Sequence, residues 1–356
     1  MTYKVLPLPP DIDLETKAVL RKTASAHRFL AELKGVAATI PNESILINTL
    51  VLQEAKDSSA IENIITTDDE LFRAELFEEF IGPAQKEVQN YARALRYGFE
   101  KARLHNLLTN KLILEIQEIL EENRAGYRKL PGTALKNQQT GAVVYTPPQE
   151  YDTIVDLMDN FEQIINDNER WPVDPLVKMA ALHFQFESIH PFYDGNGRTG
   201  RILNILYLVN KDLLRLPILY LSRYIIRHKA DYYRLLQDVR DHDAWEAWVL
   251  YVLDGVEQTA RETIVTINRI KDLMLDYKHR IRDQFPRMYS QDLLNNLFRH
   301  PYTKIEFIMR DLQVSRPTAS SYLSKLSHDK FLEKHKRGVS NYYINRPLLE
   351  IFIPKY

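Results

Sequence analysis

The chain has 356 residues, enough for two or three domains and a sizeable core. Its 47 basic and 48 acidic side chains give a formal net charge of −1, which argues against a globally basic nucleic-acid-binding protein. The absence of cysteine excludes disulfides and thiolate metal sites and favours a reducing compartment. No stretch approaches the roughly 18 apolar residues of a membrane span, and the first residues lack the apolar core of a signal peptide. We therefore expect a cytoplasmic protein without a membrane partner.

Apolar residues recur at helical spacing through most of the chain, which predicts a mainly α protein. The expected helices cover residues 14–33, 45–64, 69–80, 85–101 and 112–122, resume at residue 152, and run in long segments from 229 to about 283. Between residues 126 and 148 this spacing breaks, because prolines and glycines bracket the β-favouring Ala142, Val143, Val144 and Tyr145. A short hairpin is expected there.

Residues 188–201, SIHPFYDGNGRTGR, connect two strongly apolar segments. The segment before them carries an apolar stripe that ends at Phe184, and residues 202–209 after them are apolar on all sides, which is typical of a buried helix. The stretch is therefore expected to be a loop between two core helices. It holds three of the eleven glycines of the chain, Gly195, Gly197 and Gly200.

This loop combines residue types that together can handle phosphate. Glycines around Asn196, at the start of a helix, let backbone N–H groups form an anion-binding nest that the helix dipole reinforces. Arg198 and Arg201 lie three residues apart, on one helix face, where they can hold phosphate oxygens. Asp194 is an oxygen ligand suited to Mg²⁺, and His190 can accept a proton from a hydroxyl. Each residue alone more often has a structural role, but their joint occurrence indicates a site.

Two other interpretations of this region are rejected. The letters GNGRTG satisfy the dinucleotide-binding pattern G-x-G-x-x-G, but they follow a helical segment, and no acidic residue lies about twenty positions later. His183, Glu187 and His190 suggest metal ligands, but their spacing differs from H-E-x-x-H. We expect His183 to be a packed or capped helix residue.

Residues 190–201 resemble the signature of the Fic family, H-x-F-x-[DE]-G-N-G-R-x-x-R, at every fixed position. The resemblance implies a Fic-type helical core and a protein adenylyltransferase that moves AMP from ATP, with Mg²⁺, to a Ser, Thr or Tyr hydroxyl of a target protein and of itself. It implies that His190 is the catalytic base and Asp194 the metal ligand. The nucleotide would be held by Gly195, Asn196, Gly197, Arg198, Thr199, Gly200 and Arg201.

Two further stretches resemble parts of the same family. Residues 142–145 resemble the flap whose exposed edge aligns the backbone of a target protein, although on pattern alone they form an ordinary hairpin. Tyr232 and Tyr233 resemble a tyrosine pair near the adenine, although periodicity alone makes them plain core residues. A homodimer is expected from the resemblance only.

Ser58, Glu62 and Asn63 resemble the inhibitory motif of the family, [ST]-x-x-x-E-[GN]. By itself Glu62 would be a solvated carboxylate. Beside an intact signature, the motif predicts that Glu62 pairs with Arg201 and so denies this guanidinium to the γ-phosphate of ATP. Ser58 lies four residues earlier on the same helix face, where it either orients the carboxylate or bonds the local backbone.

The tail resembles a winged helix-turn-helix, with Ala319, Tyr322, Leu323 and Leu326 at helical spacing and a hairpin near Gly338. Residues 302–356 contain ten Lys or Arg and five Asp or Glu, a net charge of +5. This charge permits DNA binding, and docking of a protein target or second subunit is an equal alternative. The expected divisions are 1–105 for the inhibitory region, 106–250 for the Fic core, 251–288 for connecting helices and 289–356 for the winged helix.

Two other functions remain open at this stage. In the first, the chain is a DNA-binding regulator whose Fic core senses a nucleotide. In the second, it is a hydrolase that removes AMP from a modified protein, with Glu62 positioning water.

Overall fold

The computed structural model describes residues 3–68, 70–72, 82–136, 140–337 and 340–353. Most of the described chain is helical, so the predicted mainly α class is confirmed. The predicted helix at 69–80 lies almost wholly outside the described residues. The helices before the C-terminal region are α1 (Lys17–Ala37), α2 (Glu43–Ile61), α4 (Pro83–His105), α5 (Asn110–Glu121), α6 (Tyr151–Asn166), α7 (Pro175–Ile189), α8 (Asn196–Asn210), α9 (Leu221–Arg227), α10 (Lys229–His242) and α11 (Trp245–Gln284).

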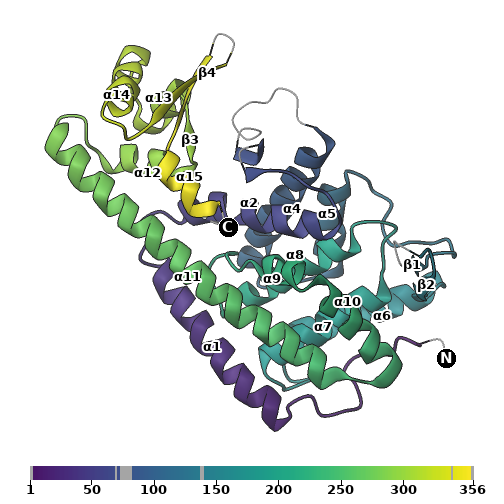
Figure 1. The fold of residues 1–356 in the computed structure, drawn as a ribbon. Coiled ribbons are helices and arrows are strands. Elements are labelled where there is room, and N and C mark those ends of the chain that lie inside the picture. The colour runs from purple at the N-terminus through teal and green to yellow at the C-terminus, as the bar shows by residue number, and fades with distance from the viewer. Residues whose placement is uncertain (1–2, 69, 73–81, 137–139, 338–339, 354–356) are drawn as a thin grey trace.

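Helices α7 and α8 pack on each other in the middle of the helical body (Figure 1). Every residue of α7 after Pro175 is buried, and α8 is buried continuously from Arg198 to Leu208. Burial on all sides explains the largely apolar run of residues 202–209, and both helices also bury polar side chains, among them His183 and Arg201. The two core helices predicted on either side of the signature stretch are therefore confirmed, but the loop between them is shorter than residues 188–201, because α7 extends to Ile189 and α8 begins at Asn196.

Helices α1 and α11 lie side by side along one flank of the body (Figure 1). Lys22 of α1 pairs with Asp254 and Glu257 of α11, the latter at 2.9 Å, and Arg261 stacks on Phe29 with 3.9 Å between guanidinium carbon and ring centre. The 40-residue α11 continues beyond the body. It crosses the division expected at residue 250, so the core and the connecting segment share one helix.

The predicted hairpin is present as the antiparallel pair β1 (Leu135–Lys136) and β2 (Val143–Tyr145). Leu135 pairs with Tyr145 and Lys136 with Val143, so the register shifts between the two positions. None of the helices in the described ranges is both long and apolar enough to cross a membrane.

The C-terminal region lies at the far end of α11 (Figure 1). Its antiparallel sheet has the order β3-β5-β4, and the hydroxyl of Tyr277 on α11 lies within hydrogen-bonding distance of the carbonyl of Phe331 (2.8 Å) and of Asn345 Oδ1 (3.0 Å). Two helices followed by a pair of strands form the succession that the sequence predicted for this region. In chain order they are α12 (Gln291–Arg299), β3 (Tyr302–Thr303), α13 (Ile305–Leu312), α14 (Arg316–His328), β4 (Glu333–Arg337), β5 (Ser340–Ile344) and α15 (Arg346–Phe352).

Candidate active site

The loop between α7 and α8 has a fixed conformation. His190 ends α7 in the left-handed region (φ 49°), with its backbone N–H donating to the carbonyl of Phe186 at 2.9 Å. Gly195 (φ 77°) precedes the first residue of α8. The Asn196 side chain closes the loop, because its Oδ1 accepts from the Phe192 N–H (2.8 Å) and its Nδ2 donates to the Phe192 carbonyl (2.9 Å). This pair of hydrogen bonds explains why an asparagine stands between the two glycines.

The N-terminus of α8 opens into a pocket of about 400 Å³. No side chain caps this terminus, so its first backbone N–H groups are available to an anion. A Cβ at position 197 would lie 2.7 Å from Glu62 Oε1, so glycine leaves the space that the Glu62 carboxylate occupies at the start of α8. The lining residues are Glu62, Ile64, Glu87, His190, Tyr193, Asp194, Gly195, Asn196, Gly197 and Arg198. The predicted base, metal ligand and phosphate cradle therefore meet in one pocket.

The His190 imidazole is held in its neutral form. Burial, together with the positive charges of Arg128 and Arg240, lowers its pKa to about 4 against a smaller opposing effect of Glu62. A neutral imidazole at physiological pH can accept a proton, as a general base requires.

Arg128 fixes the backbone around the histidine, and the sequence interpretation missed it. It is fully buried, and its Nε donates to the carbonyl of His190 (2.8 Å), while Nη2 donates to the carbonyls of Ile189 (3.3 Å) and Pro148. Its own N–H donates to the carbonyl of Pro191 at 2.9 Å. Arg128 lies in an irregular segment 62 residues before His190, where no sequence periodicity points to it. Only a long alignment or a structure could reveal its contact with the loop.

Asp194 is the exposed carboxylate at the mouth of the pocket, with 79% of its side chain accessible. One oxygen accepts from the N–H of Gly195 at 2.7 Å and lies 3.9 Å from Arg198. Within the described ranges, no group of three or more His, Cys, Asp or Glu could hold a metal ion. A single carboxylate still fits Mg²⁺ when phosphate oxygens and water complete the coordination.

Arg201 is buried on α8 and occupied by the predicted inhibitory motif. Its Nη2 donates to Glu62 Oε1 (2.8 Å) and to the Ser58 carbonyl (3.0 Å), and its Nε donates to Ser58 Oγ (2.8 Å). Burial opposes ionisation of both groups of the pair, yet their mutual attraction dominates: the pKa of Glu62 falls below its usual value and that of Arg201 rises. Ser58 thus contacts the arginine, which differs from both roles expected for it.

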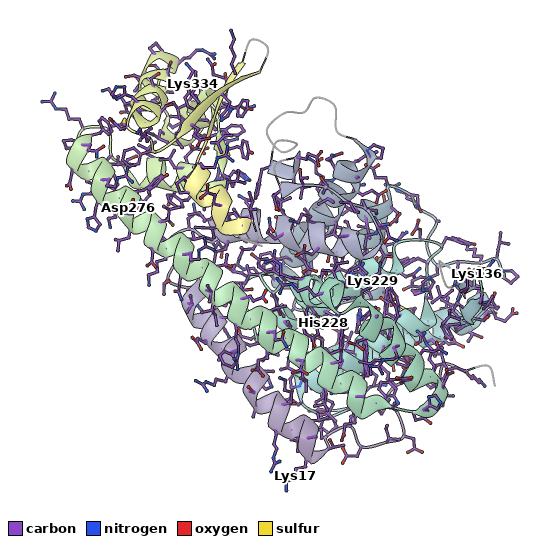
Figure 2. The ribbon with its side chains drawn as sticks, in the orientation of Figure 1. Lys17, Lys136, His228, Lys229, Asp276 and Lys334 are labelled. Carbon is purple, nitrogen blue, oxygen red and sulfur yellow. The ribbon has the colours of Figure 1, made fainter. Side chains whose placement is uncertain are left out.

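Asn63 terminates the inhibitory helix. Its φ is 64°, and the N–H groups of Asn63 and Ile64 donate to the carbonyls of Ala60 and Ser59, both at 3.0 Å, which forms a Schellman motif after α2. Lys229, labelled in Figure 2, donates to the Ile61 carbonyl (2.6 Å) and to Asn63 Oδ1 (3.3 Å). The left-handed backbone explains why the motif ends in asparagine or glycine.

Arg198 lies in different surroundings from Arg201, although one helix face was expected to present both to phosphate. Its Nη1 contacts Glu87 of α4, and its Nη2 donates to Glu121 of α5 at 2.8 Å. Thr199 is fully buried, and a Cβ at Gly200 would lie 2.8 Å from Glu187 Oε1 of α7. Gly200 therefore serves the close packing of α8 on α7, and both residues lie outside the lining of the pocket.

The tyrosine pair divides into a buried and an exposed member. Tyr232 is 2% exposed and its hydroxyl lies 2.9 Å from Nε2 of His183. Tyr233 remains 47% exposed, so it is the member that can pack on a nucleotide base. His183 stacks on Trp248 with 5.9 Å between ring centres, and burial lowers its pKa to about 3. The expectation of a packed histidine is confirmed.

The flap is similarly divided. Ala142, Val143 and Val144 are exposed, the two valines by 56% and 46%. Tyr145 was expected to belong to the target-docking surface, but it is buried, and its hydroxyl donates to the carbonyl of Ser188 at 2.7 Å. Tyr145 therefore anchors the flap to Ser188, which lies two residues before His190.

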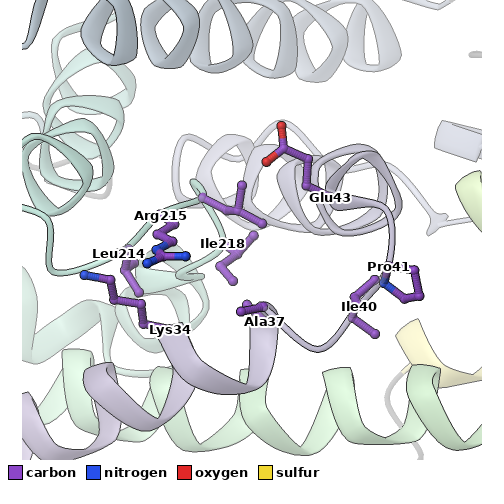
Figure 3. A pocket seen from close by; sticks show the side chains of 10 residues that line it. Lys34, Ala37, Ile40, Pro41, Glu43, Leu214, Arg215 and Ile218 are labelled. Carbon is purple, nitrogen blue, oxygen red and sulfur yellow. The ribbon is translucent and has the colours of Figure 1, made fainter.

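A second cavity of about 290 Å³ lies between the end of α1, the start of α2 and residues 214–218 (Figure 3). The side chains of Lys34, Arg215 and Glu43 reach its edge, and the rest of its lining is largely apolar. It contains no residue of the 188–201 loop, so the pocket at α8 is the candidate site.

Three family models match the chain. The model described as the Fic/DOC family N-terminal matches residues 20–100, that of the Fic/DOC family matches residues 107–208, and that of the SoFic-like protein adenylyltransferase C-terminal domain matches residues 273–348. Several curated relatives carry the name protein adenylyltransferase Fic. The relative from Drosophila mojavensis is 26% identical over 179 residues, and the one from Aedes aegypti is 29% identical over 158 residues.

These matches cover 49% and 43% of this chain but only 34% and 30% of the two relatives, about a third of their length. Among solved structures, a Fic family protein from Desulfovibrio desulfuricans superposes with a TM-score of 0.61 at 22% identity, over 95% of this chain and 98% of that one. Fic-1 from C. elegans gives 0.56 at 21% identity, over 70% and 73%. At these identities the structures show a shared fold. The chain therefore contains a Fic/DOC family N-terminal domain and, across the signature loop, a Fic/DOC family domain.

Proposed function

We propose that this protein is an adenylyltransferase that transfers AMP from ATP to a Ser, Thr or Tyr hydroxyl of a target protein and of itself. The observation that carries the proposal is the pocket in which neutral His190, exposed Asp194 and the uncapped N-terminus of α8 meet. The names of the curated relatives and of the C-terminal family model support the same chemistry.

In the proposed reaction, the target hydroxyl attacks the α-phosphorus of ATP in line. A bond forms between the hydroxyl oxygen and this phosphorus while the bond from the α-phosphorus to the bridging oxygen breaks, and pyrophosphate leaves. His190 takes the hydroxyl proton, and Arg128 keeps the histidine backbone in place. The N–H groups at the start of α8 hold the departing phosphates. Mg²⁺ bound by Asp194 would neutralise phosphate charge.

The proposal includes a built-in brake. Arg201 is the guanidinium that would hold the γ-phosphate, and it is engaged by Glu62 and Ser58. The Glu62 carboxylate also lines the pocket, where it would repel a triphosphate. ATP would then bind in a position that does not support in-line attack.

The test uses ATP labelled at either the α- or the γ-phosphate. We expect label from the α position to remain on protein, at a higher rate with the Glu62→Gly variant. Adding His190→Ala to that variant should lower transfer by about 10²–10⁴-fold, the usual contribution of a general base. Retention of γ label would instead indicate a kinase, and full transfer without His190 would exclude its role as the base.

One observation favours hydrolytic removal of AMP as a second candidate function. Glu62 and His190 line the same pocket, and 35% of the Glu62 side chain is accessible, so the carboxylate could position a water molecule. Release of AMP from a pre-modified target, lost in Glu62→Gly, would support hydrolysis. Undiminished release by Glu62→Gly would contradict it.

A further inference from the structure

The surface of α14 is polar and free of carboxylates. None of its thirteen residues is Asp or Glu, and Ala319, Leu323 and Leu326 turn to the core of the C-terminal region. The opposite side exposes Arg316, Ser321, Ser324, Lys325 and His328. The small serines let another molecule approach the helix closely, and each can donate or accept a hydrogen bond.

The neighbouring strand β4 adds positive charge beside this helix. Lys334 and Lys336 are exposed there, and neither they nor Lys325 forms an ion pair with any described residue. Lys334 is labelled at the outer end of the C-terminal region in Figure 2. β4 is an edge strand in the order β3-β5-β4, so these lysines have no further strand beside them among the described residues.

The carboxylates near this surface are already engaged. Glu306 pairs with Arg316 at 3.0 Å, and Glu333 pairs with Arg346 at 3.1 Å. Asp311 pairs with Arg310 at 2.8 Å, and Asp329 lies 3.2 Å from His328. Because these acids are compensated locally, the surface of α14 and β4 presents unpaired lysines to a partner.

We propose that α14 and β4 form a surface for duplex DNA. A major groove about 12 Å wide admits one α-helix, whose exposed serines would contact base edges. Lys325, Lys334 and Lys336 would contact phosphates on either side. Duplex RNA fits this surface less well, since its major groove is deep and narrow. This inference is independent of the proposed adenylyltransferase activity.

The experiment measures binding of the full chain to a fluorescent duplex DNA of mixed sequence between about 50 and 200 mM salt. Three phosphate contacts predict that affinity falls about 40-fold over this range. The double variant Lys325→Glu, Lys334→Glu should bind at least about tenfold more weakly and with a smaller salt slope. The matched control is Lys17→Glu, Lys271→Glu, which makes the same charge change at exposed lysines on α1 and α11.

Equal binding by the two double variants would overturn the proposal, as would no binding to duplex DNA near 50 mM salt. Equal affinity for duplex RNA would overturn the claim that α14 enters the major groove of duplex DNA. Loss of labelling of a protein target by the Lys325 and Lys334 variant, without any DNA binding, would assign the surface to protein docking instead.

A separate observation concerns the segment that follows the inhibitory motif. Phe72 is buried, stacks on Tyr302 with 6.3 Å between ring centres, and lies 6.0 Å from the ring of Phe352. Four residues earlier, Asp68 accepts hydrogen bonds from Gln53 (2.8 Å) and Lys56 (2.6 Å) of α2. Asp68 therefore contacts the inhibitory helix, and Phe72, four residues later in the chain, contacts the C-terminal region.

We infer that the C-terminal region holds α2 in its inhibitory position through Phe72. This inference rests on the proposed function, because its readout is AMP transfer. With Glu62 intact, Phe72→Ala should raise transfer about fivefold, since loss of an aromatic contact weakens docking by about that factor. The same change in the Glu62→Gly protein should have no effect. Phe29→Ala on α1 is the control for a general loss of packing.

The two failures can be told apart. No transfer by the Glu62→Gly protein would overturn the proposed function itself. Transfer by that protein, together with unchanged rates for Phe72→Ala, would overturn only the role of the C-terminal region. If Phe72→Ala is unfolded by circular dichroism, Phe72→Leu, which keeps an apolar contact without the ring, should give a smaller rise, and no rise would count against the inference.

Discussion

The two arginines of the signature loop, three residues apart on α8, meet their carboxylates in opposite ways. Arg201 is 1% exposed and pairs with Glu62, whose side chain is 35% exposed at the end of α2. Arg198 is 5% exposed and pairs with Glu121, which is only 9% exposed at the end of α5. Both pairs border the pocket, the first through Glu62 and the second through Arg198, but the carboxylate of the second pair is enclosed where α4, α5 and α8 meet.

The pKa shifts of the two carboxyl groups differ in direction as well. At Glu62, burial raises the pKa, but Arg201 more than offsets this, and the pKa falls below its usual value. At Glu121, burial dominates over Arg198, and Asp194 and Glu87 add to the effect, so the pKa rises to about 7. An accessible, fully ionised pair at a helix end suits a contact that forms and breaks. The enclosed pair suits a fixed connection between helices.

The largest expected effect is release of the brake. Glu62→Gly should raise AMP transfer roughly ten- to a hundredfold, because a hydrogen bond to a charged group is worth about 1.5–3 kcal/mol. Glu62→Gln, which keeps the shape and removes the charge, should lie between the variant and the parent. The measurement is the initial rate of α-label incorporation. Equal rates for all three proteins would mean that the Arg201 pair is as fixed as the Arg198 pair.

A smaller effect is expected at the helix end that presents Glu62. Asn63 adopts φ 64°, so Asn63→Ala should destabilise this backbone by about 1–2 kcal/mol, whereas Asn63→Gly should be tolerated. Glu62 should then be displaced from Arg201 part of the time. Because about 1 kcal/mol corresponds to about a fivefold change in population, AMP transfer should rise about fivefold. If alanine and glycine raised transfer equally, the loss of the Lys229 contact would explain the result instead of the backbone.

The sequence predicted those parts of the site that are local. The twelve-residue signature brings His190, Asp194 and the start of α8 together through chain connectivity alone, and the inhibitory motif predicted the Glu62–Arg201 pair that the structure contains. The mainly α class followed from the helical spacing of apolar residues through most of the chain.

The parts that the sequence did not predict depend on contacts between distant segments. Arg128 reaches His190 across 62 residues, and Glu121 reaches Arg198 across 77. No local spacing encodes either contact, because each depends on how separate elements pack. Adjacent tyrosines such as Tyr232 and Tyr233 differ in exposure for the same reason: the pattern does not specify which of two neighbours faces the core.

The smallest expected effect tests the opposite pKa shifts of the two carboxyl groups directly. A raised pKa means that the folded protein binds more protons than the unfolded chain between pH 4.5 and about 7, so ionised Glu121 lowers stability as pH rises through that window. A lowered pKa means that ionised Glu62 adds stability, which is lost only as pH falls through its folded value.

At pH 8 both effects are fully expressed. Glu62→Gln should therefore lower the free energy of unfolding by about 1 kcal/mol, discounted for partial exposure, and Glu121→Gln should leave it unchanged or raise it by about 1 kcal/mol. Urea unfolding at pH 8 measures both, and equal losses in the two variants would show that the two arginine pairs differ only in position.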